Sequence, residues 1–197
     1  EEIIKKVRGK NLYFSNDIKN SIANSEMVFL CVNTPTKNKG FGAGQASDLK
    51  FIESCAREVA KYSNNHTIVI EKSTLPVRTA ETIKTILNAS QNDSVSNQQT
   101  FSVLSNPEFL AEGTAINDLQ SPDRVLIGGE DIKSVEALAR IYKNWVSDEK
   151  IILTNLWSSE LSKLTANAFL AQRITSINTI AAFCENSGGE IEEVAKA

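Results

Sequence analysis

Short runs of β-branched and aromatic residues alternate with stretches of helical periodicity along most of the chain, and this alternation limits the possible folds more than any other feature. Because strand-like runs and helical stretches follow one another with short connections, the pattern predicts an α/β fold with a mostly parallel sheet covered by helices on both faces. The predicted strands span residues 12–15, 27–32, 67–71, 101–104, 125–127 and 151–154.

Several local signals mark where the helices between these strands begin. Asp17 is placed to cap a short helix, and Asp48 is placed to cap a longer one that runs to about residue 62. In the next helix, Thr74 suits the N-cap and Pro76 suits the first turn, and a further helix covers about residues 132–145. The polar stretch 88–99, rich in Ser, Asn and Gln, is interpreted as a surface loop.

The pattern changes after residue 154, where residues 157–183 form one helical run without Gly or Pro that Gly188 ends. Its apolar face is wider than one neighbour can cover, so we expect a central helix packed against another domain or a second subunit, in a dimer or a higher homo-oligomer. The predicted domains are residues 1–154 and 155–197. The apolar positions of the helix are Leu161, Leu164, Ala168, Ala171, Ile174, Ile177, Ile180, Ala181 and Cys184.

Composition excludes several classes of protein. A net charge of −3 provides no basic excess to neutralise phosphates, so nucleic acid and anionic membranes are excluded as main partners. No apolar run approaches the roughly 20 residues of a membrane span, and the opening residues lack a secretory core. Three widely spaced cysteines predict neither a disulfide framework nor a metal site. We therefore expect a cytoplasmic protein in which Cys31, Cys55 and Cys184 are small buried hydrophobes and His66 is a surface residue.

Two polar segments follow predicted strands and could contact a ligand. Residues 33–36 come directly after the strand 27–32, at the carboxyl end where open parallel sheets bind ligands, although an ordinary strand exit is equally compatible. Ser73 and Thr74 follow the next strand, where hydroxyls and free backbone N–H groups could meet an anion; a common strand-to-helix turn is the alternative. The nearby glycines at 40, 42 and 44 open no helix and are interpreted as a flexible loop rather than a phosphate cradle.

Two further segments carry charged side chains in unusual positions. Glu108 and Glu112 lie four residues apart after the strand 101–104. In a closed cleft the pKa of either carboxyl would be raised, and that carboxyl could act as a base. The alternative is a loop in which both carboxylates are solvated. Lys163 and Asn167 project from the same face of the long helix. A lysine whose ammonium only reaches the edge of a packed surface is the alternative for Lys163.

Taken together, five strings make a specific resemblance: VNTPT, EKSTLPVR, LSNPEFLAEGTAI, PDRVLIGG and SSELSKLTANAFLAQRI. In this order they resemble the UDP-glucose dehydrogenases, a family of NAD-dependent nucleotide-sugar dehydrogenases, and the eukaryotic forms most closely. The resemblance implies a Rossmann-like domain and an enzyme that oxidises UDP-glucose to UDP-glucuronate in two hydride transfers. A dehydrogenase of another nucleotide sugar, such as GDP-mannose, is the alternative, and so is a non-catalytic NAD surface and dimerisation module for this segment alone.

The resemblance also implies roles for individual residues. Thr74 would hold a catalytic water, Glu108 would do acid–base work, and Lys163 with Asn167 would hydrogen-bond the reacting sugar oxygen, whose developing charge the Lys163 cation would stabilise. The implied NAD contacts are Val32, Asn33, Thr34, Pro35, Thr36, Ser73, Thr74, Leu75 and Glu112. The implied substrate contacts are Glu108, Phe109, Leu110, Ala111, Glu112, Lys163 and Asn167.

Two family features are missing from the sequence. The family begins with a strand and a G-x-G-x-x-G turn that holds the NAD pyrophosphate, and its nucleophilic cysteine lies in a G-G-S-C segment; neither string occurs here. None of the three cysteines has surroundings that suit the nucleophile. We therefore expect the sequence to be an internal part of such an enzyme, with no turnover of its own.

Overall fold

In the computed structural model, which describes residues 2–91 and 99–197, five strands form one sheet in the order β1-β2-β3-β4-β5. The first three strands are parallel, β4 runs antiparallel to β3, and β5 is parallel to β4. The predicted mostly parallel α/β sheet is therefore confirmed. The strands are β1 (Met27–Leu30), β2 (His66–Glu71), β3 (Thr100–Ser105), β4 (Val125–Gly128) and β5 (Ile151–Thr154).

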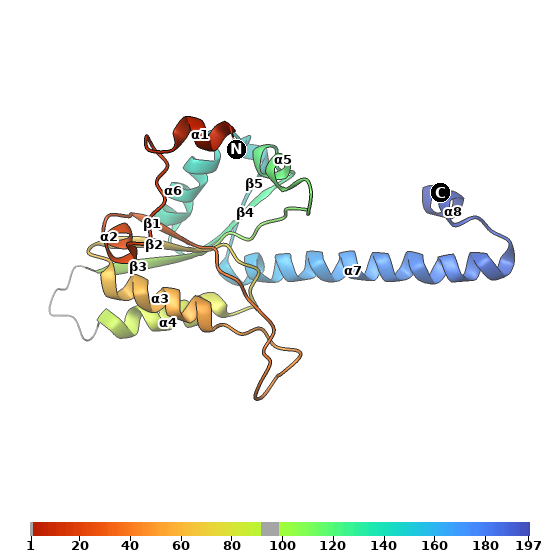
Figure 1. Ribbon diagram of the computed structural model, residues 1–197, viewed down its shortest axis with the longest axis horizontal. Helices are drawn as coiled ribbons and strands as arrows, with labels where there is room; N and C mark the ends of the chain where they lie inside the picture. The colour runs from red at the N-terminus through yellow and green to blue at the C-terminus, as the bar shows by residue number, and fades with distance from the viewer. Residues whose placement is uncertain (1, 92–98) are drawn as a thin grey trace.

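Helices cover both faces of this sheet, as Figure 1 shows: α3 and α4 lie on one side and α6 on the other. Alternate residues of each strand point to opposite faces, so Val69 packs in the core under α3 and α4 while Ile70 packs in the core under α6. The helices are α1 (Glu2–Val7), α2 (Ile18–Ala23), α3 (Lys50–Tyr62), α4 (Thr79–Gln91), α5 (Ala115–Gln120), α6 (Ile132–Tyr142), α7 (Leu156–Ser187) and α8 (Ile191–Lys196), with a short 3-10 helix at Asp148–Lys150.

Most of the predicted helix ends are where the sequence puts them. The Asp17 carboxylate accepts the Asn20 N–H at 3.1 Å and caps α2. Leu49 rather than Asp48 is the N-cap of α3, but the Asp48 carboxylate still accepts the Lys50 N–H at 3.1 Å. Gly188 ends α7 with a φ of 78°, a left-handed conformation in which glycine is unstrained.

Several predictions for the first half of the chain are wrong. Residues 12–15 form no strand: Leu12 makes only an isolated bridge with Arg8, and Tyr13 and Phe14 are exposed. Cys31 is exposed because β1 ends at Leu30, one residue before it, whereas Cys55 is half-buried and Cys184 buried. Residues 88–91 continue α4 instead of starting a loop, and residues 92–98 of the predicted loop lie outside the described residues.

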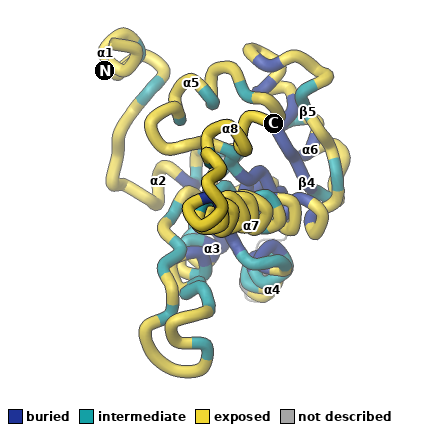
Figure 2. Tube along the Cα trace, turned by 90° about the vertical axis from the view of Figure 1, so that its right-hand side faces the viewer, coloured by how far each residue is buried: buried dark blue, intermediate teal, exposed yellow. Residues whose placement is uncertain are grey.

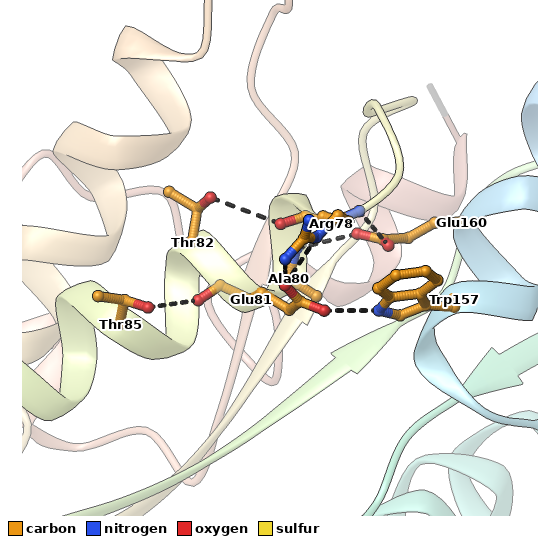
Figure 3. Close-up of polar contacts among 7 residues, drawn as sticks. All are labelled: Arg78, Ala80, Glu81, Thr82, Thr85, Trp157 and Glu160. Atoms are coloured by element: carbon orange, nitrogen blue, oxygen red, sulfur yellow. Dashed lines mark hydrogen bonds and ion pairs between the residues drawn. The ribbon is translucent and has the colours of Figure 1, made fainter.

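The start of α4 also differs from the prediction. Residues 73–78 are not helical, and the helix begins at Thr79 rather than after an N-cap at Thr74. Its first N–H groups are capped from a distance by Glu160 of α7, whose carboxylate oxygens accept the N–H of Arg78 at 2.7 Å and of Ala80 at 2.9 Å (Figure 3). Arg78 has a φ of 79°, so a local helix could not pass through it.

The long helix α7 docks on the sheet only by its first turns. Ser159 packs so closely against β4 that a Cβ built on Gly128 would lie 2.4 Å from the Ser159 Cβ, and the Ser159 hydroxyl donates to the Ser105 carbonyl at 3.3 Å. Beyond these turns α7 projects away from the sheet (Figure 1), and most of its length is exposed, as the end-on view in Figure 2 shows. None of the described helices has the length and apolar character needed to span a membrane.

Candidate functional site

A cavity of about 460 Å³ lies where the loop after β3 meets α5, α6 and α7. Because this loop leaves the carboxyl end of a strand, the cavity is at the edge of the sheet where ligands bind in α/β folds. Six of the residues implied as substrate contacts line it: Glu108, Phe109, Leu110, Ala111, Lys163 and Asn167. The structure thus brings the segment of Glu108 and the segment of Lys163 together, although more than fifty positions separate them in the sequence.

An ion pair between Lys163 and Glu108 joins the two segments. The Lys163 Nζ lies 3.2 Å from the Glu108 Oε1, and the two side chains are 9% and 32% exposed. The other Glu108 oxygen accepts the N–H of Leu110 at 2.8 Å, which fixes the carboxylate against its own loop. Since the ammonium is almost buried while the carboxylate reaches solvent, Lys163 is a cation held at the cavity wall rather than a solvated surface lysine.

The Phe109 ring lies between two cations at the same wall. Its centroid is 4.1 Å from the Arg124 guanidinium carbon and 5.3 Å from the Lys163 Nζ. Both distances are within the range of favourable cation–π contacts. Asn167, one turn beyond Lys163, is exposed on the cavity side of α7.

A buried polar network forms another wall of the cavity. Asn106 is fully buried: its amide donates to the Leu126 carbonyl at 2.8 Å, and its Oδ1 accepts from Lys72 at 3.1 Å and from Tyr142 at 2.6 Å. Burial lowers the pKa of Lys72 to about 8, although Cys31 and Glu108 act in the opposite direction. Burial likewise raises the pKa of Tyr142 to about 12.

Sequence reasoning missed the roles of Lys72, Asn106, Arg124 and Tyr142 in lining this cavity. Lys72 and Asn106 had a usable signal, because each directly follows a buried strand, where ligand contacts gather. Tyr142 had none, since it reads as an ordinary core position of α6.

Residues 33–36 and residues 73–74, the other two candidate segments, meet at a different place, the carboxyl ends of β1 and β2. The Ser73 hydroxyl donates to the Val32 carbonyl at 2.6 Å, and the Thr34 hydroxyl donates to the Thr74 carbonyl at 3.2 Å. Leu75 is buried beneath them. None of these residues lines the cavity described above, and neither does Glu112, which is exposed. The implied NAD contacts at the strand ends and the implied sugar contacts in the cavity are therefore two groups, and Glu112 directly follows Ala111 of the second group.

A mostly parallel sheet with hydroxyl-rich turns at the carboxyl ends of neighbouring strands is typical of nucleotide-binding α/β domains. Residues 1–146 match the family model described as the NAD binding domain of the UDP-glucose/GDP-mannose dehydrogenase family, and residues 157–197 match the model of its central domain. The chain belongs to the UDP-glucose/GDP-mannose dehydrogenase family.

Curated relatives and solved structures agree with this assignment. The UDP-glucose 6-dehydrogenases of Rattus norvegicus and Caenorhabditis elegans are each 56% identical over 100% of this chain, which spans 40% and 41% of those proteins. A UDP-glucose dehydrogenase from Pyrobaculum islandicum superposes with a TM-score of 0.81 at 29% identity, over 93% of this chain and 40% of that one. A GDP-mannose dehydrogenase from Pseudomonas aeruginosa has a TM-score of 0.78 at 28% identity, over 92% and 41%. The predicted family is therefore confirmed.

The residues at the ends of β1 and β2 fit the cofactor that this domain takes, NAD. Their donors and acceptors are neutral: the Asn33 amide, the hydroxyls of Thr36 and Thr74, and the backbone between them. Such groups suit ribose hydroxyls and a carboxamide, which offer hydrogen bonds and no charge. The described residues contain no cluster of three or more side chains suited to hold a metal ion.

Proposed function

We propose that this chain contributes the cofactor surface and part of the catalytic site to an enzyme that oxidises the C6 alcohol of UDP-glucose to the carboxylate of UDP-glucuronate. The observation that carries the proposal is the Lys163–Glu108 pair at 3.2 Å on the cavity wall. The sequence supports the same activity, because this chain is, over all of its own length, 56% identical to a UDP-glucose 6-dehydrogenase. The chain spans 40% of the length of that relative.

In this proposal two groups of residues hold NAD beside the sugar. Residues 32–36 and 73–75 contact the cofactor from the ends of β1 and β2, where hydrogen bonds already hold them together. Glu112 contacts it from the loop after β3. When bound, NAD supplies the acceptor for the hydride that leaves C6, in each of two successive oxidations.

The proton and the developing charge are handled by the cavity residues. The Lys163 ammonium has three N–H donors and gives one to Glu108, so others are available to the sugar oxygen as it becomes alkoxide-like. Glu108 Oε1, beside that ammonium, takes or returns a proton, and Asn167 orients the same oxygen. The hydroxyl of Thr74 holds the water needed to form the final carboxylate.

The test is the stoichiometry of the reaction in the protein expressed from its complete coding sequence. With UDP-glucose in limiting amount and NAD in excess, we expect two NADH formed per sugar, read by absorbance. Formation of no NADH would contradict the proposal. GDP-mannose is assayed in parallel, and a higher kcat/KM for it than for UDP-glucose would transfer the proposal to the other nucleotide sugar.

We also propose that the protein self-associates through α7 and acts in the cytoplasm, where the three free cysteines stay reduced. The exposed part of α7 carries Phe169, Leu170, Ile174, Ile177 and Ile180, all more than a third exposed. Apolar area of this kind is normally covered by a partner. Light scattering tests the idea: I174E combined with I177E is expected to reduce the molar mass to that of a monomer, and an unchanged mass would contradict it.

A further inference from the structure

Two carboxyl groups are buried beside each other under the first turns of α7. Glu71, the last residue of β2, is 2% exposed, and Glu160 of α7 is 4% exposed. Burial first and the Glu160 charge second raise the pKa of Glu71 to about 8. Buried like-charged groups of this kind cannot both be ionised at neutral pH without a large energetic penalty.

The cations near this pair are all engaged elsewhere. The Arg78 guanidinium lies 2.9 Å from Glu81, Lys72 donates to Asn106, and Lys163 pairs with Glu108. Apart from Glu160, the side chain that acts on Glu71 is the Ser105 hydroxyl, from the neighbouring strand. No described cation therefore neutralises the two carboxyls, and a proton must do so instead.

The surroundings decide which of the two carries that proton. The Glu160 carboxylate accepts two backbone N–H groups at the start of α4, at 2.7 and 2.9 Å, so both of its oxygens are already engaged as acceptors (Figure 3). The Glu71 Oε2 has no hydrogen-bond partner among the described residues. A proton on Glu71, facing Glu160, is the arrangement that leaves both Glu160 oxygens free to accept these N–H groups.

We propose that Glu71 and Glu160 form a buried carboxyl pair that shares one proton and positions Lys163 for the reaction. Glu160 links α7 to the start of α4. A hydrogen bond from the Glu71 carboxyl to Glu160 links α7 to β2. Lys163 follows Glu160 by three residues on the same rigid helix, so a displacement at Glu160 moves Lys163 relative to Glu108. Loss of the Glu71 proton would place two negative charges together and push the first turns of α7 off the sheet. The catalytic consequence rests on the proposed function, whereas the pairing itself does not.

Trp157 provides a readout of this docking that needs no activity. Its indole N–H donates to Glu81 of α4 at 2.6 Å, so its fluorescence reports contact between α7 and α4. Subtracting the signal of a W157F variant isolates it in the complete protein. Between about pH 6 and pH 10 we expect one transition, centred near the pKa of about 8 assigned to Glu71, and its absence in E71Q.

Matched variants separate Glu71 from its neighbours. Lys72 has a pKa of about 8 as well, so K72M must retain the transition if Glu71 is responsible. E81Q is the control for the direct partner of Trp157 and must also retain it. A transition that persists in E71Q, or that disappears in K72M or E81Q, would overturn the proposal.

Activity and spectroscopy complete the test. In the wild type we expect kcat to fall near pH 8, whereas E71Q, which mimics the protonated acid, is expected to retain kcat at pH 7 and to lack this fall. E160Q is expected to lower kcat about tenfold or more at every pH. If E71Q fails to fold, infrared difference spectra of the wild type decide: a protonated carboxyl band present at pH 7 and lost by about pH 9 supports the pair, and its absence at pH 7 overturns it. If no NADH forms at all, the proposed function fails, but the fluorescence and infrared measurements still test whether Glu71 and Glu160 form the pair.

Discussion

Removal of the Lys163 ammonium is the most direct test of the candidate site. In K163M an unbranched side chain only one atom shorter replaces the lysine, so the cation is lost while most of the cavity wall stays filled. Deleting one group that stabilises a developing oxyanion lowers kcat about 10²- to 10³-fold, equivalent to about 2.7–4 kcal/mol in the barrier. The large value is expected here because the Lys163 side chain is only 9% exposed, so water cannot easily replace it.

Stability should change little in the same variant. The partner Glu108 is 32% exposed and keeps its hydrogen bond from the Leu110 N–H, so it remains solvated when Lys163 is lost. We expect the free energy of unfolding to change by no more than about 1 kcal/mol. The matched control is K143M, which removes an exposed lysine paired with Asp148 at 2.8 Å and should leave kcat unchanged.

The assays are NADH formation with UDP-glucose at saturation and urea unfolding of the same preparations. A kcat within a factor of about three of the wild type in K163M would refute the reasoning, because it would show that the ammonium serves packing rather than charge stabilisation. A large loss of both kcat and stability would refute it as well, since the site would then have collapsed.

Three further predictions follow from the geometry. G128A should lose about 1–3 kcal/mol in urea unfolding, because the new Cβ would lie 2.4 Å from the Ser159 Cβ; an unchanged midpoint would show that α7 is not packed there. The folded-state pKa of Glu71 is raised to about 8, so its contribution to stability is complete below about pH 4.5 and is lost as the pH rises to about 8. Urea unfolding at several pH values should show this fall in the free energy of unfolding of the wild type and less of it in E71Q. Equal slopes of the free energy against pH in the two proteins would contradict the prediction. R124A, which removes the cation 4.1 Å from the Phe109 ring, should raise the KM for the sugar nucleotide about 2- to 30-fold in initial-rate assays, and an unaltered KM would exclude a role for that contact.

The parts of the fold that depend on local pattern could be predicted from the sequence. The runs of β-branched residues locate five of the six predicted strands, because each has parallel or antiparallel neighbours to pair with. Residues 12–15 form an aromatic run that also predicts a strand, but they have no neighbouring strand in the described part of the chain, so the composition alone misleads. The grouping of Glu108 with Lys163 was also within reach, since it needs only a strand end and a helix face.

Features that depend on distant residues could not be predicted. Thr74 and Pro76 form a plausible helix start, yet α4 begins later because Glu160, eighty residues away from Ala80, supplies its cap. Asn106 looks like an ordinary polar residue after a strand, and its role arises only when Lys72 and Tyr142 converge on its Oδ1. In both cases a buried polar group is satisfied by a partner that no local window contains.

The first turns of α7 connect every part of the candidate site. Glu160 caps the helix that follows the Ser73–Thr74 turn, Ser159 packs on β4, and Lys163 reaches the loop after β3. A helix bends little over one or two turns, so these contacts set a single orientation for all three side chains. In the proposed reaction, the docking of this one helix therefore sets the distance between the cofactor surface and the sugar oxygen. For this reason the buried carboxyls beneath it, and not only the residues that face the cavity, are expected to control the reaction.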